Sequence, residues 1–316
     1  MSGKVDELLP GFAWVFGPGE NGKGHSFTLT GEGIFHRQLL ALHWLSRAPA
    51  IDNWTFYAAR QPGPIDGHVI EIEGLRFDPK EIWVTPAIDA EGENIDITVW
   101  HPAWDRIDRR HQGNVTFLFL DEALGEYGTD WWIGQVEFGN GKLAGAFPLE
   151  ELAAFVEKTA TERGWKKHVP GSLWTLFSTK ESSGDFPRAD VLTQNTCVPK
   201  LFTDFMKAAG DYEDPLAGTG ADYVYASIDG SFFPKGQEVS RRGEIEEAIE
   251  RALANFDGGR CVGGAFGSER SYSDFIVFDG EGSLNAIKQA LREQKAPAGT
   301  MIEYFAREKR GQRIAL

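Results

Sequence analysis

The sequence contains few cysteines, and their scarcity excludes two classes of protein. Cys197 and Cys261 are the only two in 316 residues, too few for the dense disulfide framework of a small secreted domain. Neither has a second cysteine or a close histidine at the spacing of a zinc site. We therefore expect a protein of a reducing compartment, the cytoplasm, and one without a cofactor.

Long apolar runs and an excess of positive charge are also missing. No stretch approaches 18 uninterrupted apolar residues, the length that a membrane-spanning helix requires, and the first ten residues lack a signal-peptide core. Lys and Arg number 32 against 47 Asp and Glu, so the net charge is -15. Because nucleic-acid binders depend on clustered Lys and Arg, we expect neither a nucleic-acid nor a membrane partner. An acidic surface instead suits solubility or a basic protein partner.

Aromatic and sulfur residues divide unevenly along the chain. All ten tryptophans lie in the first 174 residues, all seven histidines lie before Val169, and both cysteines follow it. Residues 178–187 form a polar, Ser/Gly/Pro-containing segment that is typical of a linker. We therefore predict two domains, residues 1–180 and 190–316. Up to residue 180 there are 25 acids against 16 bases, and beyond it 22 against 16, so both domains are acidic.

The second half alternates strands and helices in a clear order. Apolar residues recur at helical spacing from Ile245 to Phe256, after the expected cap Ser240. Ser283 is expected to cap a second helix. In sequence order we predict a strand at 221–228, a helix at 240–256, strands at 260–266 and 272–278, a helix at 283–291 and a strand at 300–305. This βαββαβ order is that of a ferredoxin-like sandwich, an antiparallel sheet with two helices on one face.

The first half repeats this theme with more strands. We predict strands at 26–30, 54–59, 68–72, 82–85, 94–100 and 131–138, and helices at 34–47, 115–127 and 148–163, the second ended by Gly128. The near match to a phosphate-binding loop at 17–24 has Gly24 where that loop needs Ser or Thr, so we interpret it as a turn between strands. The predicted fold class is therefore α+β, with two ferredoxin-like sandwiches, the first enlarged by extra strands and a helix.

Several short runs carry a resemblance to known families. The runs 71–78 (EIEGLRFD), 82–83 (IW), 120–128 (LDEALGEYG) and 133–138 (IGQVEF) resemble a bacterial family known only as a domain of unknown function, over residues 25–165. The runs 232–234 (FFP) and 272–276 (YSDFI) make the second half similar to the ferredoxin-like domains of the protein regulator of ribonuclease E activity, type B. Neither family supplies a catalytic residue. The resemblance implies a cytoplasmic bacterial protein that acts by binding other proteins.

Three carboxylates form the first candidate site. Glu122 and Glu126 are expected one helical turn apart on one face, with Asp130 just beyond the helix end. Such a group can act as acid and base or hold a divalent ion. The same spacing of carboxylates is also typical of a solvated helix face, where a pair of like charges destabilises the helix by only about 0.2 to 0.5 kcal/mol.

The second and third candidates are loops. Residues 101–111 bring together His101, Trp104, Asp105 and His111, and polar loops of this kind carry sites more often than cores do. A glycine-rich hairpin tip at 263–272 places Arg270 and Tyr272 beside backbone amides that can bind an anion. Both loops also have a purely structural interpretation. The first can be an extended connection between elements, and the glycines of the second can serve the geometry of the hairpin.

Trp131 and Trp132 are adjacent in a predicted strand, so we expect their side chains on opposite faces. No complete catalytic constellation is visible. The leading hypothesis is thus a non-enzymatic acidic regulator, inhibitor or immunity-type protein that binds a basic protein. The alternative is a metal-assisted hydrolase, or a small-molecule enzyme or sensor, that uses the Glu122, Glu126 and Asp130 group or the 101–111 loop.

Overall fold

The chain forms two compact units in a computed structural model that describes residues 2–182 and 184–316. The N-terminal unit is Phe12–Pro170, and the C-terminal unit is Gly171–Leu316 together with Met1–Gly11. Each unit combines helices with strands, so the α+β class is confirmed. Within the part of the chain that the structure describes, no helix is both long and apolar enough to cross a membrane.

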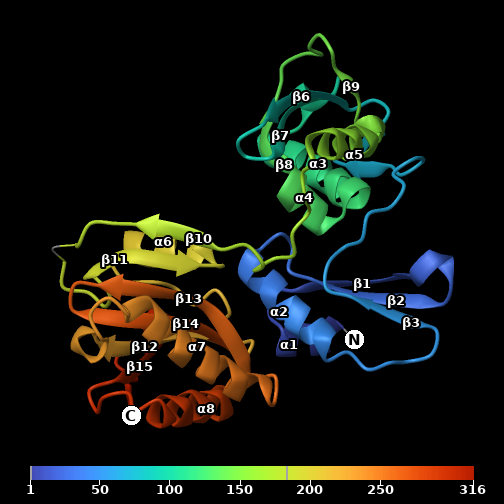
Figure 1. Cartoon of the computed structure of the whole chain (residues 1–316). Helices are drawn as coiled ribbons and strands as arrows, with labels where there is room; N and C mark the ends of the chain where they lie inside the picture. The colour runs from blue at the N-terminus through green and yellow to red at the C-terminus, as the bar shows by residue number, and fades with distance from the viewer. Residues whose placement is uncertain (1, 183) are drawn as a thin grey trace. The chain divides into compact units, whose positions relative to one another are not determined.

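A seven-stranded sheet forms the centre of the C-terminal unit (Figure 1). The elements of this unit are α1 (Ser2–Leu8), β10 (Thr175–Ser178), β11 (Val191–Thr196), α6 (Pro199–Lys207), β12 (Asp222–Asp229), α7 (Glu238–Ala254), β13 (Gly259–Gly267), β14 (Arg270–Val277), α8 (Gly280–Glu293), β15 (Met301–Tyr304) and β16 (Ile314–Ala315). The strands lie in the order β10-β11-β13-β14-β12-β15-β16, and all neighbours are antiparallel. The predicted linker at 178–187 therefore lies inside this unit, between β10 and β11.

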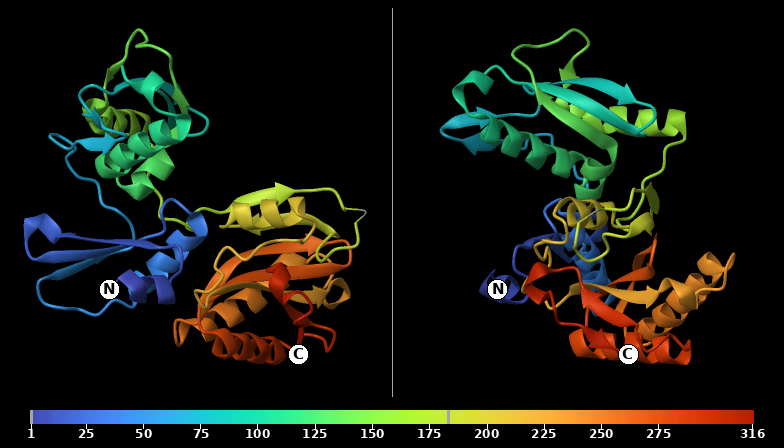
Figure 2. Two further views of the ribbon diagram at one scale, coloured as in Figure 1. Left: turned by 180° about the vertical axis from the view of Figure 1, so that it is seen from behind. Right: turned by 90° about the vertical axis from the view of Figure 1, so that its left-hand side faces the viewer.

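Helices α7 and α8 lie side by side on one face of this sheet (Figures 1 and 2). Alternate residues of a strand point to opposite faces, and most of the residues facing the helices are apolar. The core they form is fully or almost fully buried and includes Val224, Ala226, Phe275, Val277, Ile302, Ile245, Ile249, Leu253, Ile287 and Leu291. Burial of one such side chain contributes about 1.5 to 3 kcal/mol, so this layer holds the helices on the sheet.

The helix caps expected for α7 and α8 are wrong. Helix α7 begins before Ser240, with Gln237 at its N-cap. Ser283 lies inside α8, where its hydroxyl donates to the carbonyl oxygen of Gly258 at 2.6 Å. Phe256 lies beyond the end of α7 and is 38% exposed, so it does not continue the buried face.

The other face of the sheet carries a buried arginine. Arg188 precedes β11 and is 3% exposed. Its guanidinium makes a bidentate ion pair with Asp274 of β14 and lies 5.0 Å or less from the rings of Tyr225, Tyr272 and Phe305. Helix α6 covers the same face, because the ring of Phe205 packs 5.1 Å from that of Phe305. The residue that directly follows the predicted linker is therefore anchored in the sheet.

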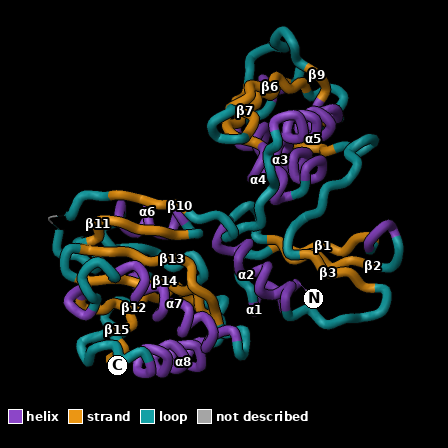
Figure 3. Tube along the Cα trace, in the orientation of Figure 1, coloured by secondary structure: helices purple, strands orange, loops and turns teal. Residues whose placement is uncertain are grey.

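The N-terminal unit contains three separate sheets, visible as distinct groups of strands in Figure 3. Its elements are β1 (Ala13–Pro18), β2 (His25–Thr30), α2 (Phe35–Ser46), β3 (Trp54–Tyr57), β4 (Ile70–Ile72), β5 (Leu75–Phe77), β6 (Trp83–Asp89), β7 (Asn94–Trp100), α3 (Arg109–Leu124), α4 (Glu126–Trp132), β8 (Ile133–Phe138), β9 (Phe147–Pro148) and α5 (Leu152–Arg163). The sheets are β1-β2-β3, β4-β5 and β8-β7-β6-β9, with parallel pairs β2/β3 and β7/β8. A single enlarged ferredoxin-like sandwich is therefore not confirmed for this half. The loop at 17–24 joins the antiparallel strands β1 and β2. This agrees with its interpretation as a turn between strands, which is based on Gly24 in place of Ser or Thr.

The helix predicted at 115–127 is two helices, because the chain breaks at Gly125. This residue has a φ of 72°, a conformation that favours glycine. A side chain there would meet Pro62 Cδ at 2.8 Å and the carbonyl oxygen of Arg60 at 3.0 Å. The break lets residues 60–63 cross close to the helix ends, where Arg60 O accepts from the amide of Glu126 at 3.0 Å.

The two adjacent tryptophans belong to the end of α4, so the prediction of a strand there is wrong. Adjacent helical residues point about 100° apart, and each ring has its own neighbour. Trp131 packs 4.8 Å from the His168 ring, and Trp132 stacks 6.3 Å from Trp165.

Candidate functional site

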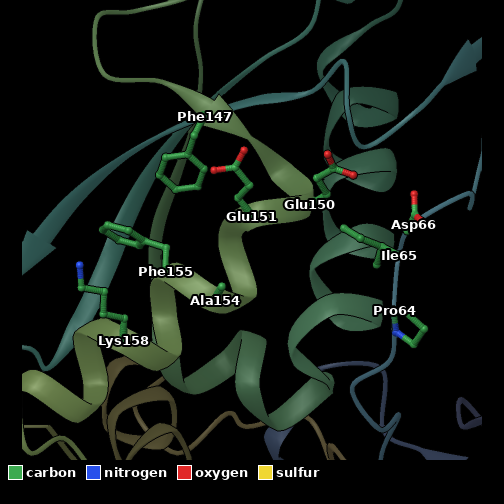
Figure 4. A pocket seen from close by; sticks show the side chains of 9 residues that line it. All are labelled: Pro64, Ile65, Asp66, Phe147, Glu150, Glu151, Ala154, Phe155 and Lys158. Carbon is green, nitrogen blue, oxygen red and sulfur yellow. The ribbon is translucent and has the colours of Figure 1, made fainter.

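A groove of about 640 Å³ lies on the surface of the N-terminal unit (Figure 4). It is lined by Pro64, Ile65, Asp66, Phe147, Glu150, Glu151, Ala154, Phe155 and Lys158. The rings of Phe147 and Phe155 lie 5.2 Å apart and form part of an apolar floor. Most of the lining surface is apolar, and acidic side chains stand around it. A cavity of this kind is a usual place for binding.

Helix α5 supplies one wall of this groove because its two faces differ. Residues Glu151, Ala154, Phe155 and Lys158 recur at i, i+3, i+4 and i+7, which places them on one side. The opposite side is buried in the core of the unit through Leu152, Val156 and Ala160. The core therefore fixes the helix, and the groove residues are left at the surface.

The acids around the groove differ in their partners. Lys80 Nζ lies 2.6 Å from Asp66 Oδ1 and 3.9 Å from Glu150 Oε2, and its ammonium lowers the pKa of Asp66. Lys158 pairs with Glu162 at 3.9 Å. Glu151 is exposed, and its side chain makes no ion pair or hydrogen bond with the other residues that the structure describes. The groove thus presents one unpaired carboxylate beside its apolar floor.

Glu126, from the first candidate group, is buried, and its carboxylate holds neighbouring segments of the fold together. Its side chain is 1% exposed. Its carboxylate accepts hydrogen bonds from Thr30 Oγ1 at 2.5 Å, Gln38 Nε2 at 3.1 Å, and the backbone amides of Gly33 at 3.1 Å and Arg60 at 3.4 Å. A carboxylate that accepts from four donors compensates well for its burial. It fastens the end of β2 and the start of α2 to α4.

Asp130 joins this group, but Glu122 does not. Asp130 Oδ2 accepts from Gln38 Nε2 at 2.5 Å, and desolvation by the surrounding protein raises the pKa of Asp130 to about 6. Burial also raises the pKa of Asp121. Glu122 lies before the break at Gly125, exposed, with its Oε1 3.8 Å from His68 Nδ1. The shared helix face expected for Glu122 and Glu126 is therefore wrong.

Three of the four residues predicted in the 101–111 loop line one cavity of about 300 Å³, namely His101, Trp104 and Asp105. The imidazole of His101 is buried between the rings of Phe77 and Trp104, and its Nδ1 accepts from the amide of Ala103 at 3.1 Å. Its Nε2 lies 3.8 Å from Glu81 Oε2. Burial lowers the pKa of His101, and Glu81 opposes this effect.

The fourth residue of that group faces elsewhere. His111 Nδ1 lies 3.0 Å from Asp108 Oδ1, and Asp108 also caps α3 by accepting from the amide of His111. Among the described residues, no group of three or more His, Cys, Asp or Glu side chains is placed to hold a metal ion.

Arg270 and Tyr272 lie at the start of β14, but neither forms an open nest at the hairpin tip. Arg270 Nε donates to Ser227 Oγ at 2.6 Å, and its Nη2 donates to the carbonyl oxygens of Ser227 and Gly299. The Tyr272 hydroxyl donates to Asp190 Oδ1 at 2.6 Å. Both residues line a cavity of about 330 Å³ on the sheet face that carries Arg188. On the neighbouring strand, burial raises the pKa of the Cys261 thiol, which suits a packing role.

Sequence reasoning missed the groove and the buried ion pair. The groove combines residues 64–66 with residues 147–158, and no local pattern connects the two segments. The helical recurrence of Glu151, Ala154 and Phe155 was the only local signal. In comparisons with known proteins, no family model, no curated protein and no solved structure matches the chain.

Proposed function

We propose that this protein is a non-enzymatic, cytoplasmic binding protein whose N-terminal unit docks a basic protein segment in the groove of Figure 4. The observation that carries the proposal is an apolar floor next to an unpaired carboxylate. The segment presents one aromatic or aliphatic side chain to Phe147 and Phe155, and a neighbouring Lys or Arg to Glu151. Interfaces depend on a few anchors of this kind, set in a desolvated pocket with a polar rim.

The overall charge favours a basic occupant. The protein carries a net charge of -15, with an acid excess in both halves of the chain. Such a field speeds association with a positively charged partner and discourages acidic ones. Because exposed charges are screened over about 8 Å at physiological salt, the charge contributes mainly to the rate of encounter, and the apolar floor contributes to the lifetime of the complex.

A peptide-display selection on the full-length protein tests this proposal. The expected enrichment is one apolar anchor within a few residues of Lys or Arg. Synthetic versions of the enriched peptides should bind the wild-type protein, and more weakly as salt is raised. Enrichment without a common motif, or of acidic motifs, contradicts the proposal.

Variants on α5 locate the binding. Ala154→Arg fills the groove with a bulky, positively charged side chain on an exposed helical position, and should weaken binding more than tenfold. Glu151→Gln removes one rim charge, worth about 0.2 to 1 kcal/mol, and should weaken binding by up to about fivefold at low salt. The matched control is Glu157→Gln, an exposed acid of the same helix that does not line the groove. Equal effects of Glu151→Gln and Glu157→Gln would place the peptide elsewhere.

We also infer that the C-terminal unit is a ferredoxin-like sandwich extended at its edges. Its central strands follow the order β13-β14-β12-β15 with α7 and α8 on one face, which supports the βαββαβ interpretation. The resemblance of this half to the regulator of ribonuclease E activity, type B, and that of the first half to a bacterial domain of unknown function, stay predictions.

A further inference from the structure

The cavity beside Arg188 is built from two rows of side chains on the uncovered part of the sheet. Strand pairing places Tyr272, Ser227 and Met301 opposite one another on β14, β12 and β15. The next row on the same face is Asp274, Tyr225 and Glu303. Because residues two apart in a strand point the same way, both rows lie on one face of the sheet, and all of these residues except Asp274 line the cavity of about 330 Å³. This volume lies in the range of sites for small molecules.

Positive charge exceeds negative charge in this cavity, although the protein as a whole is acidic. Its lining includes Arg188, Arg270 and Arg313 but only one acid, Glu303. Glu303 is matched by Arg313, whose Nε lies 2.7 Å from Glu303 Oε1. Asp274 matches Arg188. Arg270 has no such partner, because no carboxylate of the described residues lies within 4 Å of its guanidinium.

The donors of this cavity are fixed in place and not all used. Three hydrogen bonds to neutral oxygens of Ser227 and Gly299 hold the guanidinium of Arg270 through Nε and Nη2, which leaves Nη1 without a partner among the described residues. Arg188 is only 3% exposed, and its Nε has no hydrogen-bond acceptor in the described part of the chain. In the wall of the cavity, Arg270 therefore keeps free donor capacity at Nη1.

We propose that this cavity of the C-terminal unit binds a small organic anion. Its carboxylate or phosphate group contacts Arg270, and its apolar part lies against Tyr225, Tyr272 and Met301. Arginine is the side chain best suited to either group, because its planar donors match their oxygen atoms. The site is independent of the groove in the N-terminal unit.

Calorimetric titration of the full-length protein tests this, with inorganic phosphate and with benzoate as separate probes at constant ionic strength. Saturable binding of benzoate alone indicates a carboxylate ligand, and of phosphate alone a phosphate ligand. Arg270→Gln should weaken the binding at least tenfold, as expected when a charge-assisted hydrogen bond of about 1.5 to 3 kcal/mol is lost. The matched control Arg251→Gln, an exposed arginine of α7 paired with Glu247, should leave it unchanged.

A second variant covers the case in which Arg270→Gln disturbs the fold. Met301→Trp fills the cavity and leaves Arg270 and its hydrogen bonds in place, so it should also abolish binding while far-UV circular dichroism stays as in the wild type. Absence of saturable binding for both probes overturns the proposal. So does binding that survives Met301→Trp, or binding that Arg251→Gln weakens as much as Arg270→Gln.

Discussion

The buried pair of Arg188 and Asp274 gives the sharpest prediction on stability. Arg188→Met keeps the length and apolar stem of the side chain but removes its charge. Asp274 is 2% exposed, so its carboxylate would be left buried with Gln194 Nε2, at 2.9 Å, as its remaining side-chain donor. Breaking a buried pair from one side costs about 3 to 5 kcal/mol, which is a large share of the stability of a single domain.

The double variant Arg188→Met/Asp274→Leu distinguishes the cost of one unpaired buried charge from the cost of losing the whole pair. With both charges removed, the unfolding free energy should return to within about 1 to 2 kcal/mol of the wild type, because replacing a whole buried pair by apolar residues is often neutral. The matched control is Arg307→Met. Arg307 is 39% exposed and pairs with Glu213 at 2.6 Å, and an exposed pair contributes only about 0 to 1 kcal/mol.

Hydrogen exchange during urea titration is the suitable assay, because it follows each unit separately. Amides of β12 and β14 should lose protection in Arg188→Met at lower urea, and amides of β6 and β7 in the other unit should not change. Nine of the ten tryptophans lie in the N-terminal unit, so tryptophan fluorescence should also stay nearly constant. A loss below about 1 kcal/mol for Arg188→Met, or a double variant as unstable as the sum of both singles, would refute the reasoning.

Two further predictions concern pH and the helix break. Burial raises the pKa of Glu246 to about 7, against opposing effects of Arg242 and Ser273, so the folded protein holds this proton more tightly than the unfolded chain. The stability that this proton contributes is complete below about pH 4.5 and is lost as the pH rises through about 7. The free energy of unfolding should therefore fall between pH 5 and pH 8, and Glu246→Gln should reduce this fall by roughly 1 to 3 kcal/mol. A fall of the same size in the variant contradicts the prediction. Gly125→Ala should destabilise the N-terminal unit by more than about 1 kcal/mol in urea denaturation, because the left-handed φ and the contact with Pro62 both oppose a side chain; Gly113→Ala, an open helical position, is the control and should be neutral or stabilising.

Local periodicity predicted the elements of the C-terminal unit from β12 to β15, but it did not predict β10, β11, α6 or β16. The apolar positions Ile245, Ile249 and Leu253 are all buried in its core, because the helix between sheet and solvent needs one apolar face. The hairpin of β13 and β14 also lies where its turn residues predict it. These features depend on neighbours in sequence, and the sequence displays them directly.

The features that failed depend on partners distant in sequence. The apolar pattern of α3 continues across Gly125, and the chain breaks there because residues 60–63 cross close by and Glu126 bonds Thr30, 96 residues away. Arg188 directly follows the polar segment that resembles a linker, and its partner Asp274 lies 86 residues further on. Of the candidate site residues, Arg270 and Tyr272 line one cavity, but the register of three strands creates this cavity, and the local sequence does not display that register.

The grouping of the first eleven residues with the C-terminal unit affects how the protein emerges from the ribosome. Helix α1 is made before Phe12–Pro170, yet Gly171–Leu316, the rest of its own unit, is made only after them. Pro10, for example, lies against Gly218, which does not yet exist while the whole of Phe12–Pro170 is synthesised. At about 5 to 20 residues per second, the α1 segment waits for roughly 15 to 60 s. The N-terminal unit has every one of its residues long before that, so during translation it folds while the α1 segment before it still lacks its partners and the chain after it is still being made.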